Sequence, residues 1–424
     1  MGGHKVNKLA DHVLAKWGNR ALAEAAAKRA RRVADAEALA ENARNEKNSS
    51  WRMVLLTLPI TLPAALFYSV FLAVNLARLC SAAGKRPACD FTDMENNLER
   101  LAGHWAKHPC VFIAKATELS LYRDWLAETG EDLSDGMEIG VYTGETSRAF
   151  FNDHTFQYGV EYNIDRLVAY SQGEQRHQHL VSGNVQCLPF ATGVARNVVC
   201  VHSVDDMELP AEEAIKGMAR VTLPGGHVVF SGVTRAFKSQ NPLIALLYGV
   251  GLQRAGEALY RTVYVGTFNE HNRAEWTAMC ARAGLTVETY VTYVPWSTAL
   301  VFDLAYRPEV VLLNLFGWEN WLLPLARRRW FRRVLCRAAL GMRTLSDRQA
   351  DDNGIHFFLA ARRDPETEAG EAGDPGDDWR RCPACLGRLE GAADGNSMVC
   401  AACSADYPAV GGIPVLHPVA AASS

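Results

Sequence analysis

The sequence predicts an α/β fold built around a doubly wound, mostly parallel sheet of seven strands. Two observations carry this prediction. After Glu131, short apolar runs alternate with helical stretches, which is typical of a parallel sheet with crossover helices. Turns bearing glycine or acidic residues follow successive runs, as ligand-binding sheets of this kind require. The expected strands are 136–139, 156–160, 179–182, 195–201, 226–231, 286–293 and 354–361.

The bulk composition narrows the class of protein. A chain of 424 residues is too long for one compact core and should divide into two or three units. The net charge of -3 gives no reason to expect a nucleic acid partner. Of the 11 cysteines, most are scattered singly, which favours a reducing compartment in which buried thiols act as small hydrophobic groups.

The first fifth of the chain differs from the rest. Residues 11–46 are rich in Ala, Lys, Arg and Glu and predict a charged helix, either solvated or in contact with lipid headgroups. No charged residue lies between Arg52 and Arg78, a run long enough to cross a bilayer. A spanning helix is therefore one interpretation. Pro59 and Pro63 also permit a re-entrant or in-plane anchor, and a buried soluble helix is the third alternative. We expect residues 1–80 to form a charged helix followed by a membrane anchor.

A glycine-containing turn ends the first expected strand, in the segment Met137-Glu138-Ile139-Gly140-Val141-Tyr142-Thr143-Gly144. Glycines at a strand-to-helix turn let the backbone approach a ligand closely. Glu161 ends the second strand about twenty residues later, where a carboxylate can accept hydrogen bonds from ribose hydroxyls. Together they predict a nucleotide site.

Three further motifs follow in order: Gly183-Asn184-Val185-Gln186-Cys187-Leu188-Pro189-Phe190, His202-Ser203-Val204-Asp205-Asp206, and Arg220-Val221-Thr222-Leu223-Pro224-Gly225-Gly226. With the glycine turn and the acidic strand end, the set resembles the class I S-adenosylmethionine (SAM) dependent methyltransferases of the type 11 branch. The resemblance covers about 230 residues and implies a seven-stranded Rossmann-like sheet. It also implies SAM as the cofactor and a methyltransferase domain spanning residues 98–363.

The resemblance assigns roles to individual residues. Glu138, Gly140 and Gly144, with Tyr142 between them, would form the loop around the methionine part of SAM. Glu161 would bind the ribose, and Asn184 and Val185 would flank the adenine.

Two residues depart from the family pattern. Tyr142 replaces the usual middle glycine, so we expect the loop to take a less strained path or the side chain to turn away from the cofactor. Asn184 replaces the usual Asp, which removes the charge but keeps an oxygen acceptor for the adenine amino group.

Methyl transfer from a sulfonium needs mainly alignment, plus a base when the acceptor is a hydroxyl. His202, Asp205 and Asp206 are the candidate catalytic residues because they follow the fourth strand. The alternative is that they act only as polar caps of the strand end.

Residues 296–352 form an unusual insertion before the last strand. A long apolar stretch is followed by Arg327, Arg328, Arg329, Trp330, Phe331, Arg332 and Arg333. Arginines beside aromatic residues favour an interfacial helix, and a lid packed on the enzyme core is the alternative. With the N-terminal segment, the insertion predicts a membrane-associated protein whose catalytic domain faces the cytoplasm. The predicted acceptor is a lipid, a lipid-linked glycan or another amphiphile.

An acidic linker, residues 364–378, separates this domain from a small module over 379–418. Its two CxxC pairs, Cys382 with Cys385 and Cys400 with Cys403, have the spacing of a structural zinc site, and disulfides are the alternative. The residues that follow, up to Leu416, resemble the end of Trm112-type zinc ribbons, small modules that activate or stabilise methyltransferases.

Two other functions remain to be distinguished from methyl transfer. A catalytically silent protein of the same fold would act as a membrane-bound scaffold or partner subunit. An NAD-dependent enzyme is disfavoured, because the segments around Pro189 and Pro224 have no role in dinucleotide binding.

Overall fold

The computed structural model describes residues 66, 68–84, 108–151, 153–201, 204, 210–239, 242–257, 269–295, 298, 323–347, 354–365, 379–392 and 397–417. The predicted charged helix and most of the acidic linker lie outside these residues. The chain forms two compact units, which are described separately. One comprises Met1–Asn75, Lys238–Val265 and Leu300–Glu319, and the other Leu76–Phe237, Gly266–Ala299 and Asn320–Ser424.

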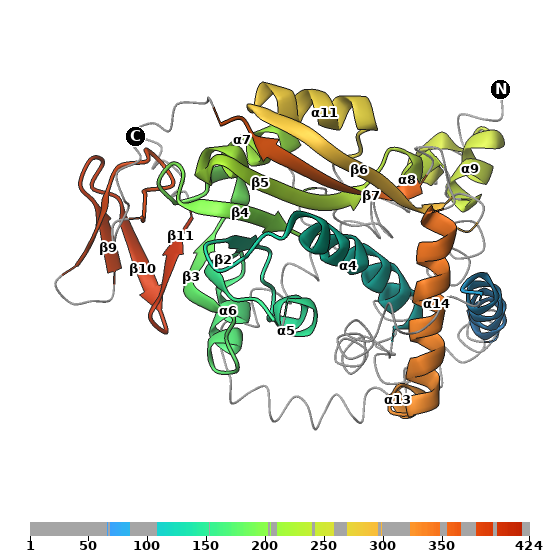
Figure 1. Ribbon diagram of the computed structural model, residues 1–424. Helices are drawn as coiled ribbons and strands as arrows, with labels where there is room; N and C mark the ends of the chain where they lie inside the picture. Colours follow the sequence, from blue (N-terminus) through green and yellow to red (C-terminus); the bar gives the residue numbers. More distant parts are fainter. Residues whose placement is uncertain are drawn as a thin grey trace. The chain divides into compact units, whose positions relative to one another are not determined.

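The larger unit contains a mixed sheet (Figure 1). Its strands are β1 (Met137–Ile139), β2 (Phe156–Glu161), β3 (His177–Gly183), β4 (Ala195–Cys200), β5 (Thr222–Val233), β6 (Leu285–Pro295), β7 (Gly354–Arg363), β8 (Leu389–Gly391), β9 (Ser397–Cys400), β10 (Asp406–Val410) and β11 (Ile413–Leu416). They lie in the order β6-β7-β5-β4-β1-β2-β3-β11-β10-β9-β8. Strands β1 to β5 are parallel where they pair, and β7 is antiparallel to both β5 and β6.

The expectation of seven strands was wrong in number, because the described sheet has 11. All seven expected strands are present, as β1 to β7. The other four come from the cysteine-bearing module, whose last strand β11 pairs in parallel with β3 and so continues the sheet. Val415 is the partner of Ser182 and Leu416 that of Gly183.

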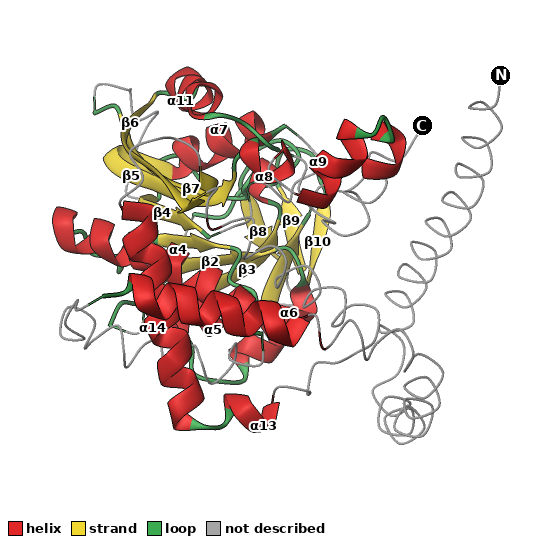
Figure 2. Cartoon of the chain, turned by 90° about the vertical axis from the view of Figure 1, so that its right-hand side faces the viewer, coloured by secondary structure: helices red, strands yellow, loops and turns green. Residues whose placement is uncertain are grey.

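Helices cover both faces of this sheet (Figures 1 and 2). On one face lie α7 (Ala211–Val221) and α11 (Arg273–Arg282), which bury Ile215, Met218 and Trp276 against the strands. The opposite face carries α4 (Pro109–Thr129), α5 (Glu145–Phe150) and α6 (Ile164–Ser171). A short 3-10 helix, η2 (Val185–Cys187), follows β3.

The start of α4 is favoured by Pro109 at its first turn, and the helix ends at Gly130, which has a φ of 67°. The C-terminus of α4 leads into the N-terminus of β1. The N-terminal half of α4 therefore lies towards the carboxyl ends of the parallel strands.

An aromatic cluster attaches the cysteine-bearing module to the sheet. Trp379 stacks on Phe190 with ring centroids 5.1 Å apart and also contacts the rings of Tyr158 and His179. Backbone hydrogen bonds reinforce the contact, since Ala191 N donates to Trp379 O at 2.8 Å. Trp379 is only 3% exposed, so module and sheet share one core.

Within the predicted insertion, the structure describes α13 (Leu323–Ala326) and α14 (Arg329–Asp347). The second half of α14 is buried and packs on α4, where Arg343 forms an ion pair of 2.7 Å with Asp124. Residues around Leu79 also pack tightly against this helix, since a Cβ at Gly341 would lie 1.8 Å from Leu79 O. This half of the insertion is therefore consistent with the alternative of a lid packed on the enzyme core. Arg329 and Trp330, at the start of α14, are exposed.

In the smaller unit, the structure describes the helical residues before Leu76 and α9 (Pro242–Gly249). Six of the large hydrophobic side chains exposed in the described part of the chain belong to this unit: Leu66, Val70, Val74, Leu246, Val250 and Leu252. Within the described residues, no helix is both long enough and apolar enough to cross a bilayer. Residues 53–65 of the predicted anchor lie outside the described residues.

Candidate functional site

The glycine turn after β1 keeps a left-handed backbone at three positions. Gly140 has a φ of 81°, Tyr142 of 57° and Gly144 of 77°. Of the two alternatives given for Tyr142, the less strained path does not occur, because the tyrosine adopts the backbone conformation that a glycine would take. The other alternative, a side chain turned away from the cofactor, stays a prediction. Such a conformation costs a side-chain-bearing residue about 1–2 kcal/mol. The ring of Tyr142 points outward, is 46% exposed, and lies under the guanidinium of Arg166 at 3.9 Å.

Gly144 is required by close approach as well as by its φ. A Cβ at this position would lie 2.1 Å from a ring carbon of Tyr170 on α6. The turn is thus packed directly against the helix that follows β2.

Glu161 at the end of β2 contacts this turn directly. Its Oε2 accepts a hydrogen bond from Tyr142 N and its Oε1 one from Asn163 N, both at 3.0 Å. Arg166 Nη1 lies 3.5 Å from the same Oε1. The side chain is 8% exposed. The structure therefore brings the predicted ribose carboxylate and the predicted loop into direct contact, because parallel β1 and β2 end at the same edge of the sheet.

Glu138 lies deeper than its predicted role suggests. Its Oε2 accepts hydrogen bonds from Ser147 Oγ at 2.5 Å and from His177 Nε2 at 2.9 Å. His177 Nδ1 in turn accepts from Tyr170 Oη at 2.9 Å, and Tyr170 Oη accepts from Arg176 N at 2.6 Å. Burial raises the pKa of Tyr170 to about 12, so this hydroxyl keeps its proton. Through these hydrogen bonds Glu138 supports the glycine turn from within the core.

Asn184 and Val185 occupy the turn after β3. Asn184 Oδ1 accepts a hydrogen bond from Gln186 N at 3.0 Å and so caps η2. Val185 is 9% exposed and packs into the main core. The amide oxygen expected to receive the adenine amino group is therefore already engaged by the backbone. The roles predicted for both residues stay predictions.

The three candidate catalytic residues, His202, Asp205 and Asp206, lie outside the described residues. The structure does describe the end of β4 that leads to them. Tyr122 Oη on α4 lies 3.0 Å from Cys200 O and 2.9 Å from Ser231 Oγ on β5.

Sequence reasoning missed a buried polar cluster at this edge. Ser231 Oγ donates to Glu118 Oε1 at 2.5 Å, and Lys115 Nζ lies 2.6 Å from the other carboxylate oxygen. Glu118 is 2% exposed. The sequence signal that could have revealed this cluster is Glu118, a charged residue among the apolar residues of the helix, because a charged side chain is rarely buried without a partner.

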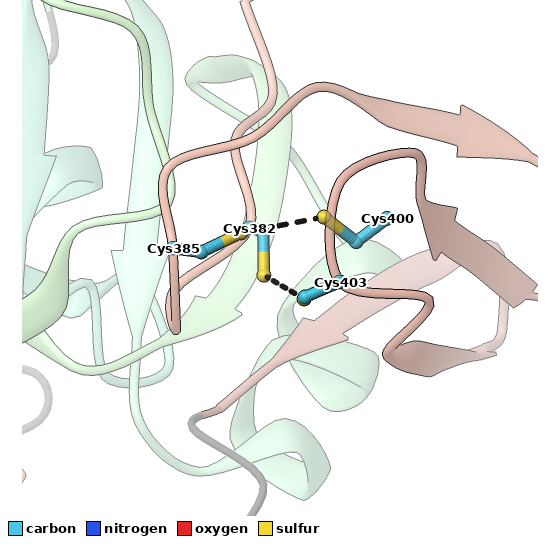
Figure 3. Close-up of side chains that lie close together, drawn as sticks. All are labelled: Cys382, Cys385, Cys400 and Cys403. Atoms are coloured by element: carbon cyan, nitrogen blue, oxygen red, sulfur yellow. Dashed lines mark hydrogen bonds between the residues drawn. The ribbon is translucent and has the colours of Figure 1, made fainter.

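The four clustered cysteines meet at one point (Figure 3). Their sulfur atoms all lie within 4.8 Å of one another. Cys382 Sγ is 3.6 Å from Cys403 Sγ, and Cys385 Sγ is 3.5 Å from Cys400 Sγ. These separations exclude a disulfide, whose sulfur atoms lie about 2.05 Å apart. They are close to the roughly 3.8 Å between thiolates held at about 2.3 Å around a tetrahedral zinc ion.

Both CxxC pairs adopt the same local structure. Leu386 N donates to Cys382 O at 2.8 Å, and Ser404 N donates to Cys400 O at 2.9 Å. Leu386 and Ser404 each have a φ of 60°, so the chain reverses immediately after each second cysteine. The repeated turn brings the four sulfur atoms close to one another, with Cys382 and Cys400 buried and Cys385 and Cys403 exposed.

The electrostatics of the cluster favour at least one thiolate. Burial raises the pKa of Cys400, but hydrogen bonds from the backbone of Cys403 and Ala402 outweigh that effect and lower the pKa to about 6. Tyr407 Oη lies 3.1 Å from Cys382 Sγ and helps to lower the pKa of that thiol. Deprotonated sulfur is the form that binds a metal ion.

Comparisons with known proteins found one family match and several structural similarities. Residues 137–230 match the family described as Methyltransferase domain. A SAM-dependent methyltransferase from Mesorhizobium loti is 12% identical, with 59% of this chain and 100% of that chain covered and a TM-score of 0.36. Magnesium protoporphyrin IX methyltransferase from Synechocystis PCC 6803, with bound SAH, is 11% identical, with 58% and 81% covered and a TM-score of 0.33. The cyclase SpnF is 15% identical, with 59% and 81% covered and a TM-score of 0.36.

No curated protein matches the chain. The family match over residues 137–230 and the mixed sheet that these residues help to build indicate a methyltransferase-type α/β fold in this part of the chain.

Proposed function

We propose that the chain is a SAM-dependent methyltransferase. The contact between Glu161 and the turn carrying Gly140, Tyr142 and Gly144 carries the proposal, because a carboxylate held there can accept hydrogen bonds from the ribose of SAM. The backbone of the turn would hold the methionine part, and Asn184 and Val185 would flank the adenine. The sulfonium supplies the electrophilic methyl group, so the protein contributes mainly alignment.

The acceptor would lose a proton as the methyl group arrives if the reacting atom is a hydroxyl oxygen. His202, Asp205 and Asp206, beyond the end of β4, are the proposed bases. Their position in the sequence supports the proposal, since the carboxyl end of β4 belongs to the same edge as those of β1 and β2.

Calorimetric titration with SAM and S-adenosylhomocysteine tests cofactor binding. The Glu161→Ala variant should bind roughly tenfold more weakly or worse, since it loses charge-assisted hydrogen bonds. Glu213→Ala is the matched control, because Glu213 lies on α7 and its side chain is 56% exposed. Since Glu161 also holds the turn, Glu161→Gln, which keeps an oxygen acceptor, should retain the circular dichroism of the wild type. Unchanged affinity in Glu161→Ala, or no binding by the wild type, would overturn the proposal.

We also propose that Cys382, Cys385, Cys400 and Cys403 bind one structural zinc ion, in a module of the Trm112 type. The sulfur separations and the lowered pKa of Cys400 support this assignment. Four protein ligands leave no open position for chemistry. Elemental analysis of the purified protein should give one zinc per chain, and a Cys400→Ser variant should contain clearly less.

The proposed acceptor is a lipid, a lipid-linked glycan or another amphiphile, met at a membrane with the catalytic domain on its cytoplasmic side. Support comes from the smaller unit, where Leu66, Val70 and Val74 are spaced four residues apart and all exposed. Exposed Trp330 beside arginines at the start of α14 is a second apolar site with basic neighbours.

Flotation with vesicles containing anionic phospholipids tests the membrane proposal. The full chain should float with the vesicles, and a Leu66→Ser, Val70→Ser, Val74→Ser variant should float less. A triple serine substitution of Glu213 and Lys216 on α7 and Thr277 on α11, which are all exposed, is the control for an altered surface. Full recovery of the wild-type chain without detergent in the soluble fraction of lysed cells, with no flotation, would contradict it.

A further inference from the structure

The C-terminal module brings one side chain to the predicted cofactor edge of the sheet. Parallel strands end at the same edge, and β11 pairs in parallel with β3. The last paired residues are Leu416 and Gly183, so the next residues on the two strands are His417 and Asn184. His417 therefore lies beside the turn that is predicted to flank the adenine.

His417 joins the ends of β2 and β3. Its Nε2 lies 2.9 Å from Ser182 Oγ, and Ser182 Oγ donates to Tyr162 O at 3.1 Å. The imidazole ring meets the ring of Tyr162 edge to face, with centroids 4.7 Å apart. Tyr162 directly follows Glu161, the proposed ribose ligand. The module thus contacts both segments between which the adenosine would lie.

The hydrogen bonds are consistent with one tautomer of the imidazole. When Ser182 donates its single proton to Tyr162 O, His417 Nε2 carries the ring proton and donates it to Ser182 Oγ. Burial lowers the pKa of His417, which keeps the ring neutral at pH 7. Nδ1 therefore holds a lone pair. This atom is shielded from solvent and has no hydrogen-bond partner among the described residues.

An unpaired buried acceptor costs free energy, so a donor from a ligand would be favourable at this position. The adenine amino group of the proposed cofactor is such a donor. Asn184, the residue first expected to receive it, already accepts from Gln186 N. We propose that His417, carried by the cysteine-bearing module, is a cofactor-binding residue whose Nδ1 accepts a hydrogen bond from the adenine amino group. This inference rests on the proposed SAM binding.

Two ligands that differ only at the adenine test the proposal on the full chain. S-adenosylhomocysteine carries the amino group, and S-inosylhomocysteine replaces it with a carbonyl. The wild type should prefer the adenosyl ligand. His417→Ala and His417→Phe should each weaken its binding about fivefold, the equivalent of one neutral hydrogen bond. Binding of S-inosylhomocysteine should change less, so the preference should shrink.

His154→Ala is the matched control, because the His154 side chain is 19% exposed and its nearest acidic neighbours are Asp132 and Asp153. His417→Phe keeps an aromatic ring against Tyr162, which guards against loss of packing. Zinc content and circular dichroism should match the wild type.

Three results would overturn the inference: unchanged binding of the adenosyl ligand, equal weakening of both ligands, or a wild type that prefers the inosyl ligand. Failure of the wild type to bind either ligand would instead contradict the proposed function itself.

Discussion

Nε2 of His177 lies 2.9 Å from Oε2 of Glu138, and neither side chain is exposed to solvent by more than 1%. The pair joins β3 to β1 across 39 positions of the chain. Together with Tyr170, it forms the support on which the glycine turn rests.

Glu138→Ala should lower the free energy of unfolding by about 3 kcal/mol or more, because it leaves His177 Nε2 and Ser147 Oγ buried without an acceptor. Urea denaturation followed by circular dichroism measures the loss. Glu128→Ala, on the exposed side of α4, should change the same quantity by less than about 0.5 kcal/mol. Equal effects of the two substitutions would show that the pair does not support the turn.

Gly144→Ala should destabilise the protein and weaken SAM binding. The added Cβ would lie 2.1 Å from the ring of Tyr170, and the φ of 77° disfavours any side chain. We expect a loss of about 1–3 kcal/mol, measured by thermal or urea unfolding. At Gly391 no heavy atom lies within 4 Å of the added Cβ, so Gly391→Ala is the control. Wild-type stability and affinity in Gly144→Ala would contradict the packing described here.

The Tyr142→Gly variant should be more stable than the Tyr142→Ala variant. At most positions a glycine instead makes a folded protein less stable than an alanine does. Both substitutions remove the contact with Arg166 at 3.9 Å, but only glycine relieves the left-handed backbone. Tyr142→Gly should therefore be more stable than Tyr142→Ala by about 1 kcal/mol. Parallel urea titrations of the two variants give this difference directly. The opposite order would mean that residue 142 does not adopt a positive φ in solution.

Removal of the proposed zinc ion should loosen the pairing of β11 with β3. The turns after Cys385 and Cys403 help to hold four sulfur atoms within 4.8 Å of one another, and as thiolates these atoms repel one another when no cation is present. Treatment with a strong chelator should speed amide hydrogen exchange at Val415 and Leu416, while the central strands β1 and β4 stay protected. Replacement of zinc should restore slow exchange. Equal protection with and without metal would contradict a structural role for the ion.

Much of the sheet could be predicted because its signals are local. The strand expected over 195–201 is β4, and that expected over 156–160 is β2, each within one residue. Buried parallel strands read as short apolar runs, and the turns between them are marked by glycine, proline or acidic residues. The strand expected over 226–231 is β5, which begins earlier, at Thr222. The prediction missed its first residues because they include a Pro-Gly pair, which is typical of a turn.

The remaining features depend on contacts between distant segments. Nothing in the local sequence of β11 specifies β3 as its partner, so the expected sheet stopped at seven strands. Similarly, the motif around Glu138 suggested a loop residue, whereas its partner His177 decides its place in the core. A relaxed turn was one of the two alternatives for Tyr142, but Glu161 accepts its backbone N–H and holds the glycine-like conformation.

The parallel pairing of β11 with β3 also bears on how the chain is made. During synthesis, β3 emerges more than 200 residues before the strand that covers it. Until β11 has been synthesised, the nascent domain presents an open strand edge at β3, the kind of surface through which chains associate with one another. Truncated variants that stop after β7 should keep this edge open and precipitate or form dimers, whereas in the chain that contains β11 its pairing covers the edge of β3.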